Sequence, residues 1–267
     1  MLLKLACWNC RGIMSAVPYL TNLLMESKID IIALSEHWLR KSQLHFLDTV
    51  DNNHYKSISK GVDEFCEGSF SCNKYGGVSF LISNVLSPYV SEIDVHSNRI
   101  CGIEINNLPG EDSIFIFSIY LPASTQPFNY FLNELEYLMD LYSAYLYHGT
   151  VLLMGDFNCK IEGPRYSFSH DMRSKLLDSY LKDLNSISLH TQNFGKGPIY
   201  TFHSYDGGPR TAIDHIVIHN DLVPNVISVE IPDDDIFNVS DHKPIICTIN
   251  FNSPLQLKPN RRQHPRR

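Results

Sequence analysis

Polar side chains follow several apolar segments of this sequence, and their types suit the hydrolysis of a phosphate ester. The clearest case is VLLMGDFNCK, residues 151–160, where an apolar run ends in Gly155-Asp156-Phe157-Asn158. Side chains alternate along an extended chain, so Asp156 and Asn158 face one way. A carboxylate beside an amide could hold a water molecule or a phosphate, but the same residues are also typical of a simple turn.

Similar groups stand next to the other apolar segments: Asn9, Arg11, Glu36, Tyr120, Asp241 and His242. Loops at strand ends carry many functional side chains because they face solvent. Glu36, Asp156 and Asp241 offer hard oxygen ligands, which suit Mg²⁺ when amide oxygens and water complete the shell. Taken singly, Glu36 could cap a helix, and residues 240–244 could form a turn that leads into a strand.

Asp214 is the residue least compatible with a purely structural role. It lies inside the apolar segment AIDHIVI, residues 212–218, where an unpaired buried carboxylate would be costly. His242 begins another apolar segment and is the candidate partner, whereas His215 must point to the opposite face. A histidine oriented by Asp214 could neutralise charge on a phosphoryl oxygen while another carboxylate activates water.

Hydrophobic periodicity predicts the elements that must position these groups. Strands are expected at 2–8, 30–35, 77–82, 99–105, 114–121, 150–154, 212–218 and 244–251. Helices are expected near 17–28, 126–147 (with Thr125 as N-cap and Pro127 in the first turn) and 171–184. Some of these strands follow one another directly, and others are separated by a helix. This order predicts an α/β protein in which two mixed sheets pack face to face with helices outside. We expect one domain over 1–251, a long loop at 60–75 and a basic tail at 252–267.

Composition narrows the class of protein. A chain of 267 residues with 43% hydrophobic residues can bury a large core, and a net charge of −7 argues against a generic nucleic-acid binder. Seven scattered cysteines favour reduced thiols over disulfides, although Cys7-x-x-Cys10 leaves a zinc site as the less favoured alternative. The N-terminus lacks the pattern of a signal peptide and no window is long enough to span a membrane, so we expect an intracellular protein, nuclear or cytoplasmic.

The motifs occur in the order seen in the endonuclease/exonuclease/phosphatase superfamily, the DNase I-like fold, and the chain resembles that superfamily over most of residues 4–250. They are CWNCRG (7–12), LSEHWL (34–39), SIYLPAS (118–124), LLMGDFN (152–158), AIDHIVI (212–218) and VSDHKPI (239–245). The resemblance implies a four-layer α/β sandwich and phosphoester hydrolysis that depends on Mg²⁺, with Mn²⁺ as a substitute.

The resemblance also implies roles for single residues. Asn9, Glu36 and Asp241 match metal-site positions, with Glu36 as the principal ligand. Tyr120 matches a phosphate contact, Asp156 the residue that aligns or activates water, and Asn158 the amide that supports it. Asp214 matches the carboxylate that orients the catalytic histidine, and His242 matches that histidine.

Within the superfamily, GDFN and IDHI are most similar to the apurinic-like endonuclease domains of non-LTR (LINE-type) retrotransposons. This resemblance implies a monomeric domain that nicks double-stranded DNA and leaves a 3′-hydroxyl for a reverse transcriptase of the same polyprotein. Two alternatives stay open. One is a phosphomonoesterase for inositol phosphates, lipids or nucleotides, because SDHKP (240–244) also occurs in such enzymes. The other is a non-catalytic nucleic-acid-binding module.

Target choice is expected to involve residues 198–214, PIYTFHSYDGGPRTAID, which we interpret as a hairpin with a Gly207-Gly208-Pro209 tip. Thr201 and His203 would share one face, and Arg210 would stand near the tip, within reach of a DNA groove or phosphate. Arg11, from the first motif, is a further candidate for substrate binding. An ordinary exposed turn is an equally good interpretation of the hairpin.

Overall fold

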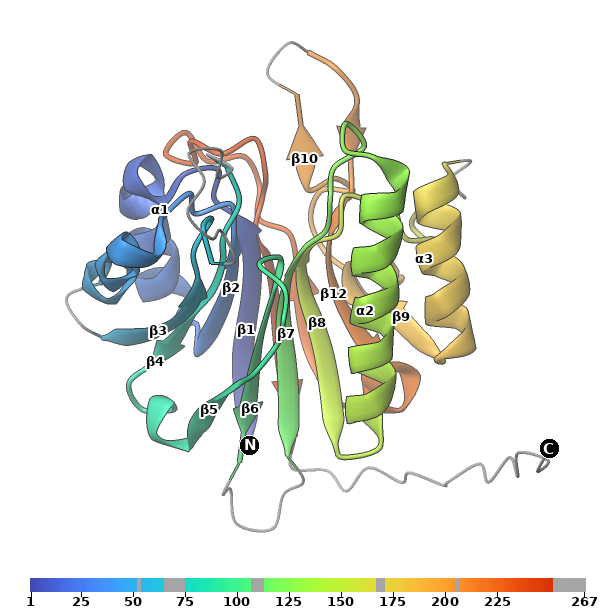
Figure 1. Cartoon of the computed structure of the whole chain (residues 1–267), viewed down its shortest axis with the longest axis horizontal. Helices are drawn as coiled ribbons and strands as arrows, with labels where there is room; N and C mark the ends of the chain where they lie inside the picture. Colours follow the sequence, from blue (N-terminus) through green and yellow to red (C-terminus); the bar gives the residue numbers. More distant parts are fainter. Residues whose placement is uncertain (52–53, 65–74, 107–112, 167–170, 205–206, 252–267) are drawn as a thin grey trace.

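Two six-stranded β-sheets lie face to face at the centre of the molecule (Figure 1). A computed structural model describes residues 1–51, 54–64, 75–106, 113–166, 171–204 and 207–251. The first sheet has the order β13 (Val226–Glu230), β14 (Ile245–Asn250), β1 (Leu2–Asn9), β2 (Ile31–Ser35), β4 (Val78–Ser83) and β3 (Tyr55–Lys60). The second has the order β5 (Val90–Ile93), β6 (Ile100–Ile105), β7 (Ile114–Tyr120), β8 (Thr150–Asp156), β12 (Asp214–His219) and β9 (Ser186–Ser188).

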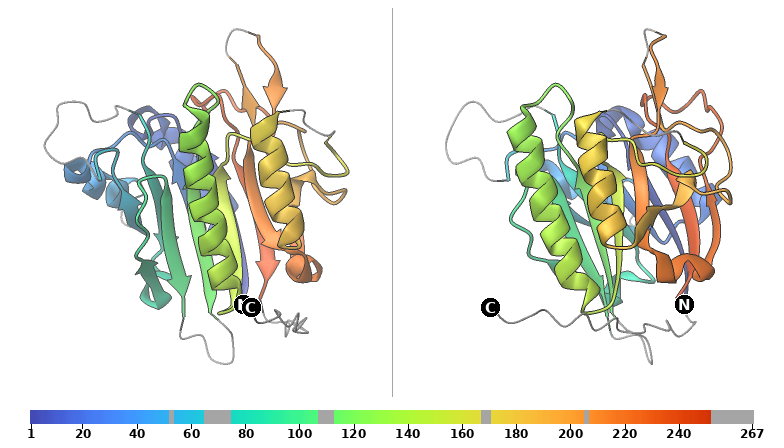
Figure 2. Two further views of the ribbon diagram at one scale, coloured as in Figure 1. Left: turned by 45° about the vertical axis from the view of Figure 1, so that its right-hand side comes forward. Right: turned by 90° about the vertical axis from the view of Figure 1, so that its right-hand side faces the viewer.

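Both sheets are mixed, because β1 pairs with β2 and β7 pairs with β8 in parallel while their other pairings are antiparallel. Helix α1 (Ile13–Ser27) covers the outer face of the first sheet, and α2 (Phe128–Leu146) and α3 (Met172–Asp183) cover that of the second (Figures 1 and 2). The described residues also form four 3₁₀ segments: η1 (Lys41–Thr49), η2 (Ser87–Tyr89), η3 (Leu189–Thr191) and η4 (Asn220–Asn225). The predicted α/β sandwich of two mixed sheets is confirmed.

The central strands are apolar throughout because each contributes to two cores. In β8, Leu152 and Met154 pack between the two sheets, while Val151 and Leu153 pack beneath α2 and α3. Alternate residues of a strand point to opposite faces, so a strand covered on both sides shows no polar alternation.

The structure departs from the sequence-based prediction at element ends and sheet edges. Helix α1 begins at Ile13, four residues before the predicted start. Helix α2 has Pro127 as its N-cap with no side-chain cap, so Thr125 is not the cap. Four short strands at the sheet edges were missed, and each mixes polar with apolar residues instead of forming a continuous apolar run: β3, β5, β9 and β13.

The five cysteines within the described residues are free, and the zinc alternative does not fit. The Cys7 thiol lies between the sheets and contacts the His215 carbonyl, whereas Cys10 lies beneath α1 and contacts the Ser35 carbonyl. Residues 65–74 of the predicted loop, Cys66 and Cys72 among them, and the tail at 252–267 lie outside the described residues. Among the helices that the structure describes, none has the length and apolarity needed to cross a membrane.

Candidate active site

Strand register brings the polar groups of different motifs together at one end of the sandwich. On neighbouring strands of the second sheet, Asp156 pairs with Tyr120 on one side and with Asp214 on the other. In the first sheet Asn9 pairs with Ser35, the residue before Glu36. This is the end from which the hairpin of β10 (Phe202–His203) and β11 (Arg210–Thr211) projects (Figure 1). A cavity of about 800 Å³ opens there, lined among others by Glu36, Tyr120, Asp156, Asn158, Asp241 and His242.

Asp214 and His242 form a buried polar pair in the site. His242 Nδ1 lies 2.8 Å from Asp214 Oδ2, and the two residues are 6% and 0% exposed. Burial alone would lower the pKa of His242, but the charge and the hydrogen bond of Asp214, together with Asp156 and Asp241, raise it to about 9. The imidazole is therefore positively charged at neutral pH and can stabilise an anionic phosphoryl oxygen.

Hydrogen bonds to its N–H and its carbonyl fix the backbone of His242 in this position. The Ser240 hydroxyl donates to the Asn9 carbonyl and accepts from the His242 N–H, at 2.7 and 3.0 Å. The Trp8 indole donates to the His242 carbonyl at 3.0 Å. Both sheets therefore place the histidine, because Asp214 belongs to the second sheet and Trp8 and Asn9 to the first.

Asp156 is held as a carboxylate that can accept a proton near neutral pH. Its Oδ2 accepts from Asn9 Nδ2 at 2.9 Å and its Oδ1 from the Asn158 N–H at 2.8 Å. Burial, followed by the charge of Asp214, raises the pKa of Asp156 to about 7 despite these donors and the opposing charge of His242. A general base works best when its pKa lies near the working pH.

Three donors surround the Glu36 carboxylate. Asn9 Nδ2 and Trp38 Nε1 each donate to it at 3.1 Å, and the Tyr120 hydroxyl also bonds to it. Burial and the charges of Glu36 and Asp156 raise the pKa of Tyr120, so its hydroxyl remains a donor. Asn9 therefore bridges Glu36 and Asp156 through a single amide nitrogen.

The donor set fits a hard divalent cation. Glu36 and Asp156 line the cavity, and neither has a cationic partner within hydrogen-bond or salt-bridge distance among the described residues. Ligand atoms of Asp156, Asp214 and His242 also lie within 4.8 Å of one another, but Asp214 and His242 are already bonded to each other. Carboxylate and amide oxygens are the ligands that Mg²⁺ prefers, so the open position is the one between Glu36 and Asp156.

Arg11 forms a salt bridge with Asp241, the third predicted metal-site residue. Arg11 reaches it from a left-handed backbone conformation, φ 44°, next to Gly12 at φ 97°. Asp241 is buried, and its Oδ1 has no hydrogen-bond partner within the described part of the chain. The guanidinium is on the cavity wall, with 43% of the Arg11 side chain exposed.

The predicted hairpin is present, as β10 (Phe202–His203) and β11 (Arg210–Thr211), but Thr201 does not face a substrate. Thr201 is fully buried, and its hydroxyl accepts from the N–H groups of Ile213 and Asp214. The expectation of a direct contact is corrected: Thr201 secures the strand that carries Asp214. His203 is half-buried and donates its N–H to the Asp241 carbonyl, and exposed Arg210 stacks 4.6 Å from the ring centre of Tyr200.

Several cavity residues were not singled out from the sequence, and three of them contact residues of the predicted site. They are Trp38, which bonds to Glu36; Phe202, whose ring centre lies 5.0 Å from that of His242; and Arg99, which stacks 4.8 Å from the ring centre of Tyr120. Trp38 lies in the quoted LSEHWL motif, two residues after the predicted ligand. In the sequence, the only feature that could have pointed to Arg99 is its position directly before an apolar segment.

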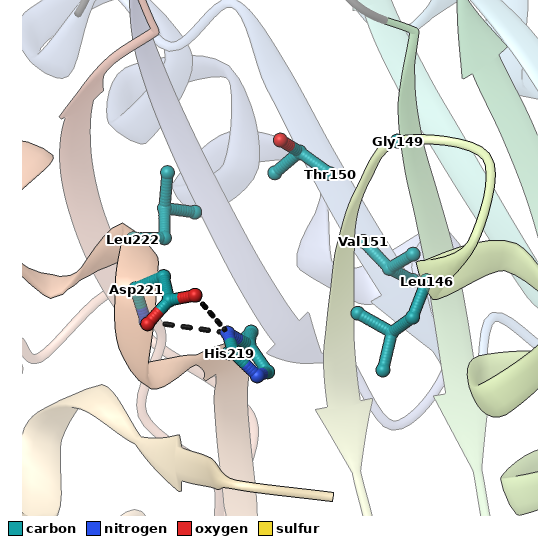
Figure 3. Close-up of a pocket in the computed structure, with 7 residues that line it drawn as sticks. All are labelled: Leu146, Gly149, Thr150, Val151, His219, Asp221 and Leu222. Carbon is teal, nitrogen blue, oxygen red and sulfur yellow. Dashed lines mark hydrogen bonds and ion pairs between the residues drawn. The ribbon is translucent and has the colours of Figure 1, made fainter. Parts of the chain in front are cut away.

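A second, much smaller pocket lies at the opposite ends of the same strands (Figure 3). Its volume is about 100 Å³, and it is bordered by Thr150 at the start of β8 and His219 at the end of β12. His219 Nδ1 lies 3.5 Å from Asp221 Oδ2. The predicted site residues all lie elsewhere, and the pocket is too small for a nucleotide.

Comparison with known proteins agrees with this geometry. Residues 6–242 match the model of the Endonuclease/Exonuclease/phosphatase family. The solved structures that resemble the chain include AP endonuclease LMAP from Leishmania major, with a TM-score of 0.71 and 14% identity, covering 93% of this chain and 87% of that one.

Two further solved structures share the fold. The endonuclease domain of TRAS1, a telomere-specific non-LTR retrotransposon, has a TM-score of 0.67 and 15% identity and covers 95% of this chain and 100% of that one. The 3′ phosphatase NExo from Neisseria, bound to a product DNA hairpin, has a TM-score of 0.65 and 18% identity. The match covers 93% of this chain and 99% of that one. No curated protein matches the chain.

Proposed function

The chain belongs to the endonuclease/exonuclease/phosphatase family, and from that premise we propose that it is a divalent-metal-dependent DNA endonuclease that leaves a 3′-hydroxyl. The observation that carries the proposal is the convergence of a charged Asp214–His242 pair, the Asp156 carboxylate and Glu36 on one open cavity. That cavity, about 800 Å³, has room for a segment of nucleic acid rather than for a phosphate alone.

The proposed reaction is an in-line hydrolysis. Asp156 accepts a proton from water as the water oxygen bonds to phosphorus, and the bond from phosphorus to the 3′ oxygen breaks. The released oxygen takes a proton from solvent, which gives a 3′-hydroxyl and a 5′-phosphate. His242 stabilises the charge on the phosphoryl oxygens, and Tyr120 and Asn158 supply further donors at the cavity wall.

Glu36, with Asn9 and Asp156 beside it, would hold Mg²⁺, or Mn²⁺ in its place. A divalent ion at this position would offset negative charge on the phosphate. Asn9 presents its amide nitrogen to both carboxylates. Its amide oxygen would therefore face the ion only after a flip of the side-chain amide. The assignment of oxygen and nitrogen in such a group rests on its hydrogen bonds.

Nicking of supercoiled plasmid tests the proposal. The chain should convert supercoiled to open-circular DNA with Mg²⁺ and not with EDTA, and His242→Ala should slow the reaction at least about 10²-fold. Lys182→Ala, which removes an exposed ion pair with Glu162, is the matched control and should nick at the wild-type rate. Equal nicking with Mg²⁺ and EDTA, or by wild type and His242→Ala, would refute the mechanism.

Two further experiments test which chemical group the 3′ end of the nick carries and whether a reverse transcriptase can extend that end. A DNA polymerase should extend the nick without prior end repair if it carries a 3′-hydroxyl. The TRAS1 endonuclease domain supports a retroelement role, in which a reverse transcriptase of the same polyprotein uses that end. Extension of the nick by a reverse transcriptase along an annealed RNA would support that role, and a blocked 3′ end would contradict it.

A phosphomonoesterase is the second candidate, supported by the Neisseria structure described as a 3′ phosphatase. Release of inorganic phosphate from 3′-phosphoryl DNA, nucleotides or inositol phosphates, with plasmid left intact, would favour it. DNA binding that is insensitive to EDTA and causes no nicking would favour a non-catalytic module.

A further inference from the structure

Four carboxyl groups lie in or directly beneath the cavity, and their partners divide them into two pairs. Asp214 is bonded to the His242 imidazole, and Asp241 forms a salt bridge with the Arg11 guanidinium. Glu36 and Asp156 instead share the Asn9 amide, a neutral donor. Two of the four carboxyl groups are therefore paired with a cationic side chain, and Arg99, a further cation of the cavity wall, stacks on Tyr120. Glu36 and Asp156 are left as the two neighbouring carboxyl groups that a divalent cation can join.

We propose that Arg11 supplies from within the chain the positive charge at Asp241, so that the centre takes up a single divalent cation, between Glu36 and Asp156. This inference rests on the proposed metal site and revises the prediction that Asp241 is a metal ligand. Asp241 becomes the residue that holds Arg11 in the cavity wall.

The surroundings of Asp241 are unfavourable for a second ion. A guanidinium cannot be deprotonated in a protein, so Arg11 keeps its charge at any working pH. His242 Nε2 lies 3.9 Å from Asp241 Oδ1, on the side that Arg11 leaves open. An ion at Asp241 would therefore lie close to two cationic side chains, and the repulsion between like charges at that range opposes its binding.

Arg11 is also not free to move aside at low cost. Its φ of 44° belongs to a region that side chains other than glycine rarely adopt, and its N–H donates to Asn9 Oδ1 at 3.1 Å. The next residue, Gly12, cannot carry a side chain, because a Cβ there would lie 2.7 Å from the Trp38 ring. The segment that carries Arg11 is thus fixed against the residues that surround Glu36.

Direct counting of bound Mn²⁺ tests the inference without reference to activity. Mn²⁺ would be titrated into the full chain, and the free ion followed by electron paramagnetic resonance. We expect one bound ion per wild-type chain, lost in Glu36→Gln. Arg11→Met should bind two, because Asp241 becomes an unpaired carboxylate, and Arg11→Lys, which keeps the charge, should bind one.

Two further variants locate the additional ion. Asp241→Asn in the Arg11→Met background should return the count to one. Lys182→Met is the control, because it leaves the Glu162 carboxylate without its exposed ion pair, which is 2.8 Å long. This variant should also bind one Mn²⁺ ion. Circular dichroism checks folding, and Arg11→Gln replaces Arg11→Met if the latter does not fold.

Two bound ions in wild type, or one in a folded Arg11→Met or Arg11→Gln, would overturn the inference while leaving the endonuclease proposal standing. No specific binding by any variant would overturn the proposed metal site and this inference with it. Plasmid nicking measured on the same samples separates these cases, because the endonuclease proposal fails only when nicking is absent or independent of the metal.

Discussion

At the scale of single residues, the site combines charge matching with backbone strain. Four of the six non-glycine residues with positive φ in the described chain carry or flank its polar groups: Arg11, Glu36, Trp38 and Asn158. Such conformations cost roughly 1–3 kcal/mol each and persist only where the surroundings enforce them. They cluster where β1, β2 and β8 end, because each strand must turn sharply to deliver its side chain into the cavity.

Asp214→Asn tests the charge on the histidine. Without the Asp214 carboxylate, the strongest influence that opposes burial is lost, so the pKa of His242 falls and less of the imidazole is charged at pH 7.5. We expect nicking to fall by about 10²- to 10⁴-fold, as for loss of a general acid–base group. The variant-to-wild-type ratio should rise as pH is lowered from 8 to 6, because the imidazole regains its proton. A ratio independent of pH would mean that Asp214 acts only by position.

His215, which points away from the site, should make stability depend on pH. Its Nδ1 contacts the Ser188 hydroxyl and its Nε2 the Cys159 carbonyl, both at 2.9 Å, and burial lowers its pKa to about 4. Between pH 6.5 and 4, His215 binds a proton in the unfolded chain but not in the folded chain. The free energy of unfolding therefore falls as pH drops, by about 2 kcal/mol from pH 7.5 to 5 for this residue alone.

Urea unfolding at pH 7.5 and 5 measures this effect. His215→Gln should be less stable than wild type at pH 7.5 yet lose less stability at pH 5. His45→Gln, at an exposed position, is the control and should keep the wild-type difference. If His215→Gln also keeps that difference, then His215 is not a source of the acid sensitivity.

At the scale of elements, the contact between β7 and β8 positions Asp156. Gly155, with φ 141°, precedes it, and a Cβ on Gly155 would lie 2.2 Å from the Ile119 carbonyl oxygen on β7. The glycine in GDFN therefore gives room to the neighbouring strand, not to a ligand. Asp156 keeps its place opposite Tyr120 because β7 can approach so closely.

Gly155→Ala should consequently damage both stability and activity. Overpacking and a disfavoured φ together should lower the free energy of unfolding by at least about 2 kcal/mol. Nicking should fall in the fraction that remains folded, because Asp156 is displaced. Gly207→Ala, with φ 77° and open space around the added carbon, should cost only about 1 kcal/mol. Equal costs for the two variants, measured by urea unfolding, would contradict this role for β7.

The sequence predicted the central elements well because their residues are buried on two faces. The strands that became β1, β7 and β8 are nearly continuous apolar runs, which few other local structures produce. The edge strand β3, YKSISK, is half exposed and carries two lysines, so its composition resembles that of a loop. Short edge strands are defined by pairing to a distant neighbour, and one sequence does not reveal such a partner.

The same reason limited the prediction of the site. Asp156 and Glu36 could be found because each follows an apolar run directly. The Arg11–Asp241 salt bridge joins residues 230 positions apart, and Thr201 was assigned to an exposed face although its hydroxyl is buried beneath β12. Pairings between distant residues depend on sheet order, which local patterns leave open.

At the scale of the whole molecule, the two sheets form the cavity jointly, so its occupant should stabilise the entire fold. A ligand present at about 100 times its Kd adds about 2.7 kcal/mol to the stability of the form that binds it. Saturating Mg²⁺ should therefore raise the Tm by roughly 5–10 °C for a chain of this size. Differential scanning calorimetry with Mg²⁺ and with EDTA measures the shift.

Glu36→Gln provides the comparison for that measurement. It removes one of the two neighbouring carboxyl groups that lack a cationic partner among the described residues, so its Tm with EDTA should equal or exceed that of wild type while Mg²⁺ adds little. An equal Mg²⁺-dependent rise in wild type and Glu36→Gln would place the ion elsewhere on the molecule.

The pairing of β1 with β14 determines when the centre can assemble during synthesis of the chain. β1 leaves the ribosome well before β14, which follows more than 200 residues later, yet the two strands lie side by side, with Cys7 opposite Ile245. His242 and Asp241 directly precede β14, so a growing chain lacks the pairing that brings them to Asn9. Until that strand is made, the nascent polypeptide has no assembled centre, so the proposed nuclease activity cannot appear before β14 has been synthesised.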